Sequence, residues 1–326
     1  MKALVLEEVS KFVYKDVETP LPGPGEVQIN IKACSICGSD VHGYDGSSGR
    51  RVPPMIMGHE ASGVVSAVGE GVTKFKVGDR VALWWTTHNQ YITISENNAC
   101  LIDDITFEDA AMFHIATFPM AAIRKCHLEM GESAIVMGIG ILGIIALQLL
   151  KIAGAAPIIA VDPNPEKRKK ALELGADYAL NPYDADFAQE VKKLTDGGAK
   201  VGIEVTGIGA GLDGILDCMA HFGRVALLGC TRDSNFNIDY YRKVHGPGIT
   251  LIGAHTMARP NQESHSGWWT QHDDVNALIK LTKLGRLNLS ALVEETHSPI
   301  EATEIYTRLA NEKTFPIVQF DWRKLK

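Results

Sequence analysis

The chain has 326 residues, of which 45% are hydrophobic and 22% are charged, and its formal net charge is -7. This length favours two domains over a single core, and the composition is that of an ordinary globular protein. An acidic balance without any block of lysines and arginines disfavours nucleic acid and anionic membranes as partners. Six cysteines are too few for a disulfide scaffold, so we expect reduced thiols in a cytoplasmic setting.

The first part of the chain, residues 1–118, is predicted to be rich in β-structure. Short apolar runs alternate with Gly/Pro turns such as Pro22–Gly25, and the runs are Val27–Ala33, Ala61–Val68 and Arg80–Leu83. The N-terminal run Met1–Leu6 is too short for a signal peptide, and it is predicted to form another strand.

In residues 119–254, near-continuous apolar strands alternate with helices, which indicates a parallel sheet covered on both faces. The predicted strands are Ala134–Met137, Ile158–Val161, Val201–Val205, Arg224–Leu228 and Thr250–Ile252. The helices between them include Pro165–Leu174 and Gly209–Ala220. The longest apolar stretch, Ile139–Leu150, is shorter than a membrane span and is interrupted by glycine.

The last part of the chain, residues 255–326, returns to a mixed pattern. Helices are predicted at Asp273–Lys283 and Ile300–Asn311, followed by a closing strand at Ile317–Phe320. We therefore expect a β-rich domain, formed by residues 1–118 and 255–326, that is interrupted by an α/β domain at residues 119–254.

A glycine motif, Gly138–Gly143, reads G-x-G-x-x-G and lies between the strand Ala134–Met137 and a predicted helix that ends near Ala153. Gly138 permits a tight turn, Gly140 lets the backbone approach a pyrophosphate, and Gly143 packs helix against strand. With Leu142, these glycines are the predicted phosphate-binding residues. The alternative is an ordinary glycine-rich turn in an α/β protein.

Asp162 follows the second strand, 19 residues after Gly143, where an acid would bond the ribose hydroxyls of a dinucleotide. A carboxylate there would repel a 2′-phosphate, so the sequence favours NAD over NADP. Lys167 and Arg168 lie nearby and oppose that preference, and Lys167 is itself a candidate cofactor-binding residue.

Two short segments, Cys37–His42 and Gly58–Glu60, group a thiol, imidazoles and carboxylates in the β-rich part. Such side chains suit zinc, and a catalytic zinc site uses three of them and keeps one position open. Cys34 and Cys37 also form a C-x-x-C, which could be a redox pair or half of a structural zinc site. Neither a βαβ context nor a second cysteine pair is present, so Cys34 is predicted to pack in the core.

These segments, the Val77–Val81 turn and the Gly138–Gly143 motif, in this order and spacing, resemble the zinc-containing medium-chain alcohol dehydrogenases. The likeness is nearest to the sorbitol dehydrogenase-like, polyol-oxidising branch. It implies a GroES-like β-rich catalytic domain plus a doubly wound parallel-sheet (Rossmann) cofactor domain. It also implies hydride transfer between a secondary alcohol of a polyol or sugar and NAD, and a homodimer or homotetramer.

The resemblance also implies roles for individual residues. Three of them become zinc-site residues: Cys37, His59 and Glu60. Asp40 becomes a carboxylate that orients a ligand imidazole, and Ser39 with His42 becomes a proton relay from the substrate hydroxyl to solvent. Zinc would lower the pKa of a bound alcohol. Serine is too weak a base to act alone, whereas an imidazole such as that of His42 is the side-chain type suited to pass protons near neutral pH.

The sequence departs from the family pattern in two places. The segment from Val81 to Tyr91 lacks the lobe of four cysteines that holds a structural zinc in many relatives, so we expect one zinc per chain. At His114, relatives carry a Glu or Cys that reaches the catalytic zinc. Histidine is also a good zinc ligand, and we expect His114 to bind the metal or to contact substrate.

Five aromatic side chains are candidates for substrate contact, because aromatic faces suit sugar rings and imidazoles bond hydroxyls: Trp84, Trp85, His88, His255 and Trp268. Trp269 and His265 lie beside the last of these. The alternative is that the tryptophan pairs are core or subunit-interface residues. Arg259 could instead recognise an acidic substrate.

Two other functions use the same fold. One is a zinc-free quinone or enone reductase, which is disfavoured because Cys37, His59 and Glu60 are all retained. The other is a non-catalytic protein that senses NAD(H) or packs like a crystallin. Such a protein would not need Ser39 and His42 beside the metal residues.

Overall fold

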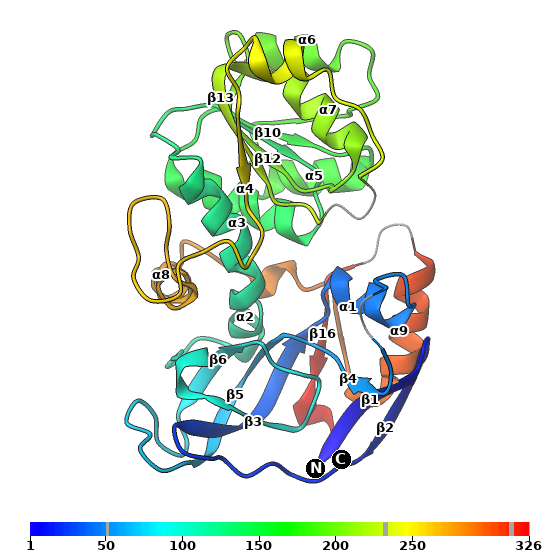
Figure 1. Ribbon diagram of the computed structural model, residues 1–326, viewed down its shortest axis with the longest axis vertical. Helices are drawn as coiled ribbons and strands as arrows, with labels where there is room; N and C mark the ends of the chain where they lie inside the picture. The colour runs from blue at the N-terminus through cyan, green and yellow to red at the C-terminus, as the bar shows by residue number, and fades with distance from the viewer. Residues whose placement is uncertain (50–51, 231–233, 313–315, 326) are drawn as a thin grey trace. The chain divides into compact units, whose positions relative to one another are not determined.

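The structure of the protein is a computed structural model that describes residues 1–49, 52–230, 234–312 and 316–325. The chain forms two compact units (Figure 1). Unit 1 contains residues 1–114 and 275–326, and unit 2 contains residues 115–274. The second division therefore falls later than the predicted boundary at residue 254, because the segment 255–274 packs with the α/β unit.

Unit 1 is built on two sheets. Its strands and helices are β1 Lys2–Glu8, β2 Lys11–Asp16, β3 Glu26–Ser35, α1 Gly38–Tyr44, β4 Met55–Ile56, β5 Glu60–Val68, β6 Arg80–Trp84, β7 Tyr91–Ser95, β8 Ala99–Leu101, α2 Phe107–Ala111, β15 Glu295–His297, α9 Ala302–Asn311 and β16 Val318–Asp321. The smaller sheet has the order β2-β1-β4. The larger has the order β15-β16-β3-β5-β6-β8, and β7 pairs with β3.

The core of unit 1 lies under β3 and β5, whose apolar residues alternate inward. The two strands are antiparallel, with Ile31 opposite Gly63 and Cys34 opposite Ala61. Gly63 is required by close packing, because a Cβ there would lie 2.3 Å from the Asn30 carbonyl oxygen. The register places the end of β3 beside the start of β5, so the residues just after Cys34 meet those just before Ala61.

Unit 2 is an α/β layer structure. Its elements, with the helices that join it to unit 1, are α3 Phe113–Lys125, β9 Ala134–Met137, α4 Ile141–Ala153, β10 Ile158–Val161, α5 Pro165–Glu173, β11 Tyr178–Leu180, α6 Phe187–Leu194, β12 Ala199–Glu204, α7 Gly209–Asp217, β13 Met219–Leu227, β14 Thr250–Gly253 and α8 Gln271–Lys283. The six strands are parallel in the order β11-β10-β9-β12-β13-β14. The predicted fold class is confirmed.

The order of the strands locates a binding edge. From β9 the chain proceeds to β10 on one side of the sheet and later to β12 on the other. Ligands of doubly wound sheets bind at such a switch point, beyond the carboxyl ends of the strands. The turn after β9 is the Gly138–Gly143 motif, so the topology places that motif at the switch point.

Two local predictions differ from the structure. Helix α3 continues through Pro119, where we expected a domain to begin, although proline removes one helical hydrogen bond. Helix α7 ends at Asp217 rather than Ala220, because β13 already begins at Met219. Within the described ranges, no helix is both long and apolar enough to cross a membrane.

Candidate metal and dinucleotide sites

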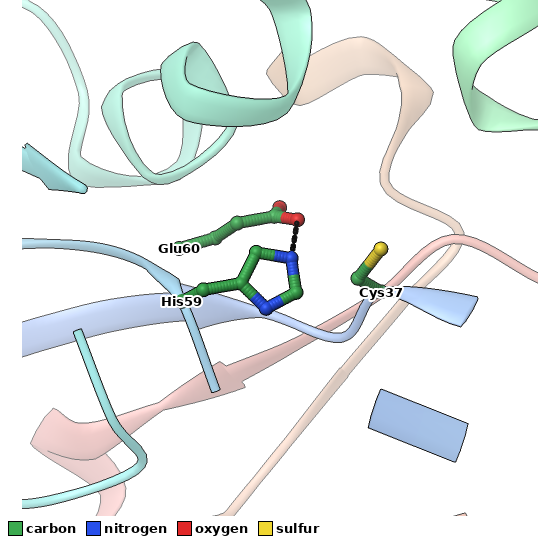
Figure 2. Close-up of side chains that lie close together, drawn as sticks. All are labelled: Cys37, His59 and Glu60. Atoms are coloured by element: carbon green, nitrogen blue, oxygen red, sulfur yellow. Dashed lines mark ion pairs between the residues drawn. The ribbon is translucent and has the colours of Figure 1, made fainter. Parts of the chain in front are cut away.

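The pairing of β3 with β5 builds the candidate metal site. Cys37 follows the end of β3 and is the N-cap residue of α1, while His59 and Glu60 stand at the start of β5. Because Cys34 pairs with Ala61, the two segments meet. Cys37, His59 and Glu60 each offer a ligand atom, and these three atoms lie within 4.8 Å of one another (Figure 2).

The geometry and burial of this group fit a cation. The His59 Nε2 atom lies 3.1 Å from Glu60 Oε1. Glu60 is 0% exposed, and among the described residues its carboxylate meets the side chains of His59 and Cys37 but makes no further hydrogen bond. A buried carboxylate is costly unless a cation compensates it. A thiol, an imidazole and a carboxylate together are a donor set that zinc accepts.

Asp40 contacts both His59 and Cys37 of this group. One of its carboxylate oxygens lies 3.3 Å from His59 Nδ1, and the other accepts a hydrogen bond of 3.3 Å from the Cys37 backbone N–H. Asp40 is fully buried. A carboxylate on Nδ1 keeps the proton there and leaves Nε2 to bind a metal. One side chain thus orients His59 and holds the backbone of Cys37.

The charges of the group shift its pKa values. Burial lowers the pKa of His59, but Asp40, Cys37 and Glu60 outweigh burial and raise that pKa well above its ordinary value. Burial raises the pKa of Glu60, although His59 opposes this. Without a cation, the negative groups therefore favour a proton on His59, and a metal ion would replace that positive charge.

His114 lies beside this group but outside it. It stands on α3 and is 1% exposed, and its ring centroid is 5.8 Å from that of His59. The ring centroid of His114 also lies 4.8 Å from that of Trp85, and the two rings meet edge to face. Trp85 has a φ of 62°, in the left-handed region that bulky residues rarely adopt, and is 47% exposed. The strained backbone therefore presents an aromatic ring near the candidate metal site.

The predicted relay residues both stand on α1. His42 follows Ser39 by one helical turn, and its side chain is 41% exposed. Its Nδ1 atom lies 3.0 Å from Ser47 Oγ. This position suits a residue that exchanges protons with solvent, and the role of the pair stays a prediction.

The prediction that His88 contacts substrate is wrong. His88 is 0% exposed, and its two ring nitrogens lie 3.2 Å from Cys34 Sγ and 2.9 Å from the Tyr306 hydroxyl. The short connection from β6 to β7 turns this side chain into the core. Trp84 is also buried, at 4% exposed, so its ring is not a stacking face on the surface of unit 1.

The glycine loop of unit 2 has the geometry that its sequence predicts. Gly138 has a φ of 100°, which favours glycine. A Cβ at Gly140 would meet nothing within 4 Å, so the backbone there is open to a ligand, whereas a Cβ at Gly143 would lie 1.9 Å from the Gly138 carbonyl oxygen. Leu142 stands in the first turn of α4, whose N-terminal N–H groups suit a phosphate.

Asp162 stands at the end of β10 and is 7% exposed. Its carboxylate accepts hydrogen bonds from the backbone N–H groups of Ile139, at 2.9 Å, and Asn164, at 2.8 Å. The acid therefore also holds the glycine loop in place. Lys167 lies half-buried in the first turn of α5.

The remaining candidates lie in the segment that follows β14. His255 is exposed and accepts a hydrogen bond from the Met257 N–H, and Trp268 packs under the Lys125 ammonium, 4.6 Å from the ring centroid. Sequence reasoning missed a second such pair, Arg124 over Trp269 at 3.5 Å. The substrate roles of His255 and Trp268 stay predictions. Arg259 bonds the Thr256 carbonyl and lies near the buried Asp274.

Comparisons with known proteins agree with this geometry. Residues 23–125 match the alcohol dehydrogenase GroES-like domain, and residues 142–266 match the zinc-binding dehydrogenase family. The L-threonine 3-dehydrogenase of Thermococcus kodakarensis is 30% identical, over 94% of this chain and 93% of its own. The chain belongs to the zinc-binding medium-chain alcohol dehydrogenases.

Two further relatives lie in the same family. The sorbitol dehydrogenase of Halalkalibacterium halodurans is 31% identical over 79% of this chain and 84% of its own. The structure of 2R,3R-butanediol dehydrogenase from Bacillus subtilis superposes with a TM-score of 0.83 and 26% identity, over 98% of this chain and 99% of that one. The predicted family and enzyme class are confirmed: the chain is a zinc-dependent alcohol dehydrogenase. The predicted cofactors, zinc and NAD, are those of this family.

Proposed function

We propose that the chain oxidises a secondary alcohol of a polyol or sugar-like substrate and passes the hydride to NAD. The observation that carries this proposal is the group of Cys37, His59 and Glu60, in which Glu60 is fully buried, with the buried carboxylate of Asp40 against His59. The relatives' names support the substrate class. Threonine, sorbitol and butanediol each carry a secondary hydroxyl beside a second polar substituent.

The metal site would be held by three side chains. A thiolate from Cys37 and a carboxylate from Glu60 would balance the two positive charges of zinc, and His59 adds no charge when its Nε2 is deprotonated. Bound zinc supplies a Lewis acid that lowers the pKa of the substrate hydroxyl. Asp40 keeps the His59 imidazole in the required tautomer.

His114 and Trp85 would position the substrate. His114 lies outside the three-residue group, so a contact with a substrate hydroxyl suits it better than direct ligation. The exposed ring of Trp85, which touches His114, offers an apolar face to the carbon skeleton of a polyol. The two residues together favour a substrate with alternating polar and apolar surface.

Proton transfer would run through α1. Ser39 would take the proton of the substrate hydroxyl and hand it to His42, whose half-exposed imidazole passes it to solvent. Once the relay has removed the proton from the hydroxyl oxygen, the hydride on the adjacent carbon would be transferred to the nicotinamide.

NAD would bind at the switch point of the unit 2 sheet. The open backbone at Gly140 and the start of α4 suit the pyrophosphate, and Asp162 suits the ribose diol. Because Asp162 is a carboxylate, we propose NAD rather than NADP as the preferred cofactor.

The assembly and setting are proposals of the same kind. Strand β14 is one of the two edges of the unit 2 sheet, and its Leu251 is 40% exposed, which supports pairing between copies in a homodimer or homotetramer. All six cysteines are free thiols, and this supports a reducing cytoplasm.

The test is a substrate screen that follows NADH absorbance. Purified protein is assayed with sugar alcohols, vicinal diols, 3-hydroxy amino acids and simple secondary alcohols, and Cys37→Ala serves as the matched inactive control. We expect zinc-dependent NAD reduction with at least one polyol. Reduction of quinones or enones that survives chelation would instead indicate the zinc-free reductase, and inactivity throughout with bound NAD would indicate a non-catalytic protein.

A further inference from the structure

His88 stands at the centre of a buried hydrogen-bond chain in unit 1. Its ring links Cys34 Sγ, at 3.2 Å from Nδ1, to the Tyr306 hydroxyl, at 2.9 Å from Nε2. The indole N–H of Trp322 donates to Cys34 Sγ from 3.1 Å. This series of hydrogen bonds therefore connects β3, the β6–β7 connection, α9 and the C-terminal segment, and His88 bridges β3 to α9.

The donors and acceptors in this series of hydrogen bonds can be assigned consistently. Burial raises the pKa of Cys34 to about 12, so the sulfur carries its hydrogen. The thiol accepts from Trp322 and can donate to His88 Nδ1, which leaves the Nε2–H to donate to Tyr306.

The same ring closes on the segment that carries the metal ligand His59. Gly58 has a φ of 111°, and a Cβ there would lie 2.9 Å from His88 Nδ1. The backbone N–H of His88 also donates to the Met57 carbonyl from 2.7 Å. The imidazole thus packs face against the glycine that immediately precedes His59.

We infer that His88 is a positioning residue for the metal site, which it acts on through Gly58 and Cys34 without touching the metal. On one side it fixes the turn before His59, and on the other it bonds Cys34, which lies one short turn before Cys37. This inference rests on the proposed function, because it requires Cys37 and His59 to hold zinc.

The inference sets a requirement on the side chain. A ring of similar volume without nitrogens, as in His88→Phe, removes one hydrogen bond from the Cys34 thiol and one from the Tyr306 hydroxyl, both of which are buried. The thiol and the hydroxyl should then shift to regain a hydrogen bond, and the turn at Gly58 should shift with the ring that packs against it. His88→Asn places an amide near the position of Nδ1 and keeps one of the two bonds, so it restores part of the geometry.

The experiment measures metal binding and not only activity. Zinc affinity is determined by competition with a chromophoric chelator in the full-length wild type, His88→Phe, His88→Asn and Tyr306→Phe. The Co²⁺-substituted proteins are compared by their thiolate-to-cobalt absorption, which reports the geometry at Cys37. Leu309→Ala is the matched control, because it trims the same buried core on α9 and lowers stability without altering the hydrogen-bond chain.

We expect His88→Phe to bind zinc about tenfold more weakly, the lower end of the loss for residues that orient metal ligands, and to shift the cobalt spectrum. His88→Asn should regain part of the affinity, and Leu309→Ala should match the wild type. Wild-type affinity and spectrum in a folded His88→Phe would overturn the inference. If His88→Phe does not fold, the same comparison with Tyr306→Phe decides. Failure of the wild type itself to bind zinc through Cys37 would overturn the proposed function instead.

Discussion

Replacing Asp40 with asparagine should weaken zinc binding while leaving the fold intact. The two side chains have the same shape, but an amide has one acceptor oxygen and a donor NH₂ group. The carboxylate now serves both His59 Nδ1 and the Cys37 N–H. In Asp40→Asn one of these loses its acceptor, and an amide nitrogen that faces Nδ1 favours the tautomer with the proton on Nε2, which cannot bind metal.

The expected loss of zinc affinity in Asp40→Asn is estimated from the burial of Asp40 and from the lengths of its two contacts. Loss of a partner that orients a ligand histidine typically weakens metal binding by about 10- to 100-fold. Asp40 is 0% exposed, so solvent does not screen the loss. Both of its contacts are 3.3 Å, at the long end for hydrogen bonds. We therefore expect a loss near the middle of the range, roughly 30-fold or about 2 kcal/mol.

The assay is competition between the protein and a chromophoric zinc chelator at neutral pH, with circular dichroism to check folding. Asp45→Asn is the control, because it makes the same change at the C-cap of α1, where Asp45 bonds the Ser47 N–H and does not face His59. Its zinc affinity should equal that of the wild type. Equal affinities in Asp40→Asn and the wild type would refute the role of Asp40.

Four further results are expected. Asp162→Ala should reduce the preference for NAD over NADP by roughly tenfold or more, the loss of one charge-assisted hydrogen bond, as measured by kcat/KM with each cofactor. His42→Ala should lower turnover at neutral pH by about 10²-fold, the low end for general acid–base catalysis because solvent can replace the relay, with partial rescue at high pH. Removal of zinc with a chelator should abolish activity but keep most of the circular dichroism spectrum. Arg224 holds the pKa of the Glu132 carboxyl below its ordinary value. The ion pair should therefore stabilise unit 2 above about pH 4.5, and this stabilisation should be lost as the pH falls through the lowered pKa of folded Glu132. In Glu132→Gln, the urea concentration at the midpoint of unfolding should consequently fall less steeply with decreasing pH than in the wild type.

A different result would contradict each of these four predictions. An unchanged cofactor ratio in Asp162→Ala would remove that residue from ribose recognition. An unaltered pH–rate profile in His42→Ala would place the proton path elsewhere. Global unfolding on chelation would make the zinc structural, and equal acid sensitivity of Glu132→Gln and the wild type would show that this ion pair adds no pH-dependent stability.

The sequence predicts most of unit 2 because each signal there is local. Strands such as Ala134–Met137 are continuous apolar runs, and the glycines that follow have roles that depend on their immediate neighbours. The φ of Gly138 and the close approach at Gly143 agree with the predicted turn and the predicted packing of helix against strand. The metal group was predictable only from the pattern of residue types, since Cys37 and His59 meet through a strand register that no local signal specifies.

The errors have a physical reason as well. The sequence predicts a substrate contact for His88 because an imidazole can bond hydroxyl groups, but the direction of its side chain depends on Cys34 and on Tyr306, which is distant in sequence. Pro119 suggested a boundary, yet tertiary packing carries α3 through it. The segment 255–274 was expected in the β-rich domain, and contacts such as Lys125 with Trp268, which periodicity does not reveal, hold it in unit 2 instead.

The central claim is that Cys37, His59 and Glu60 hold one catalytic zinc ion. The most direct test is the zinc content per chain of the wild-type protein and of Cys37→Ser, both loaded with zinc, desalted and measured by mass spectrometry of the metal. We expect one zinc ion per wild-type chain and almost none in folded Cys37→Ser. Equal zinc content in the two proteins, or none in the wild type, would contradict it.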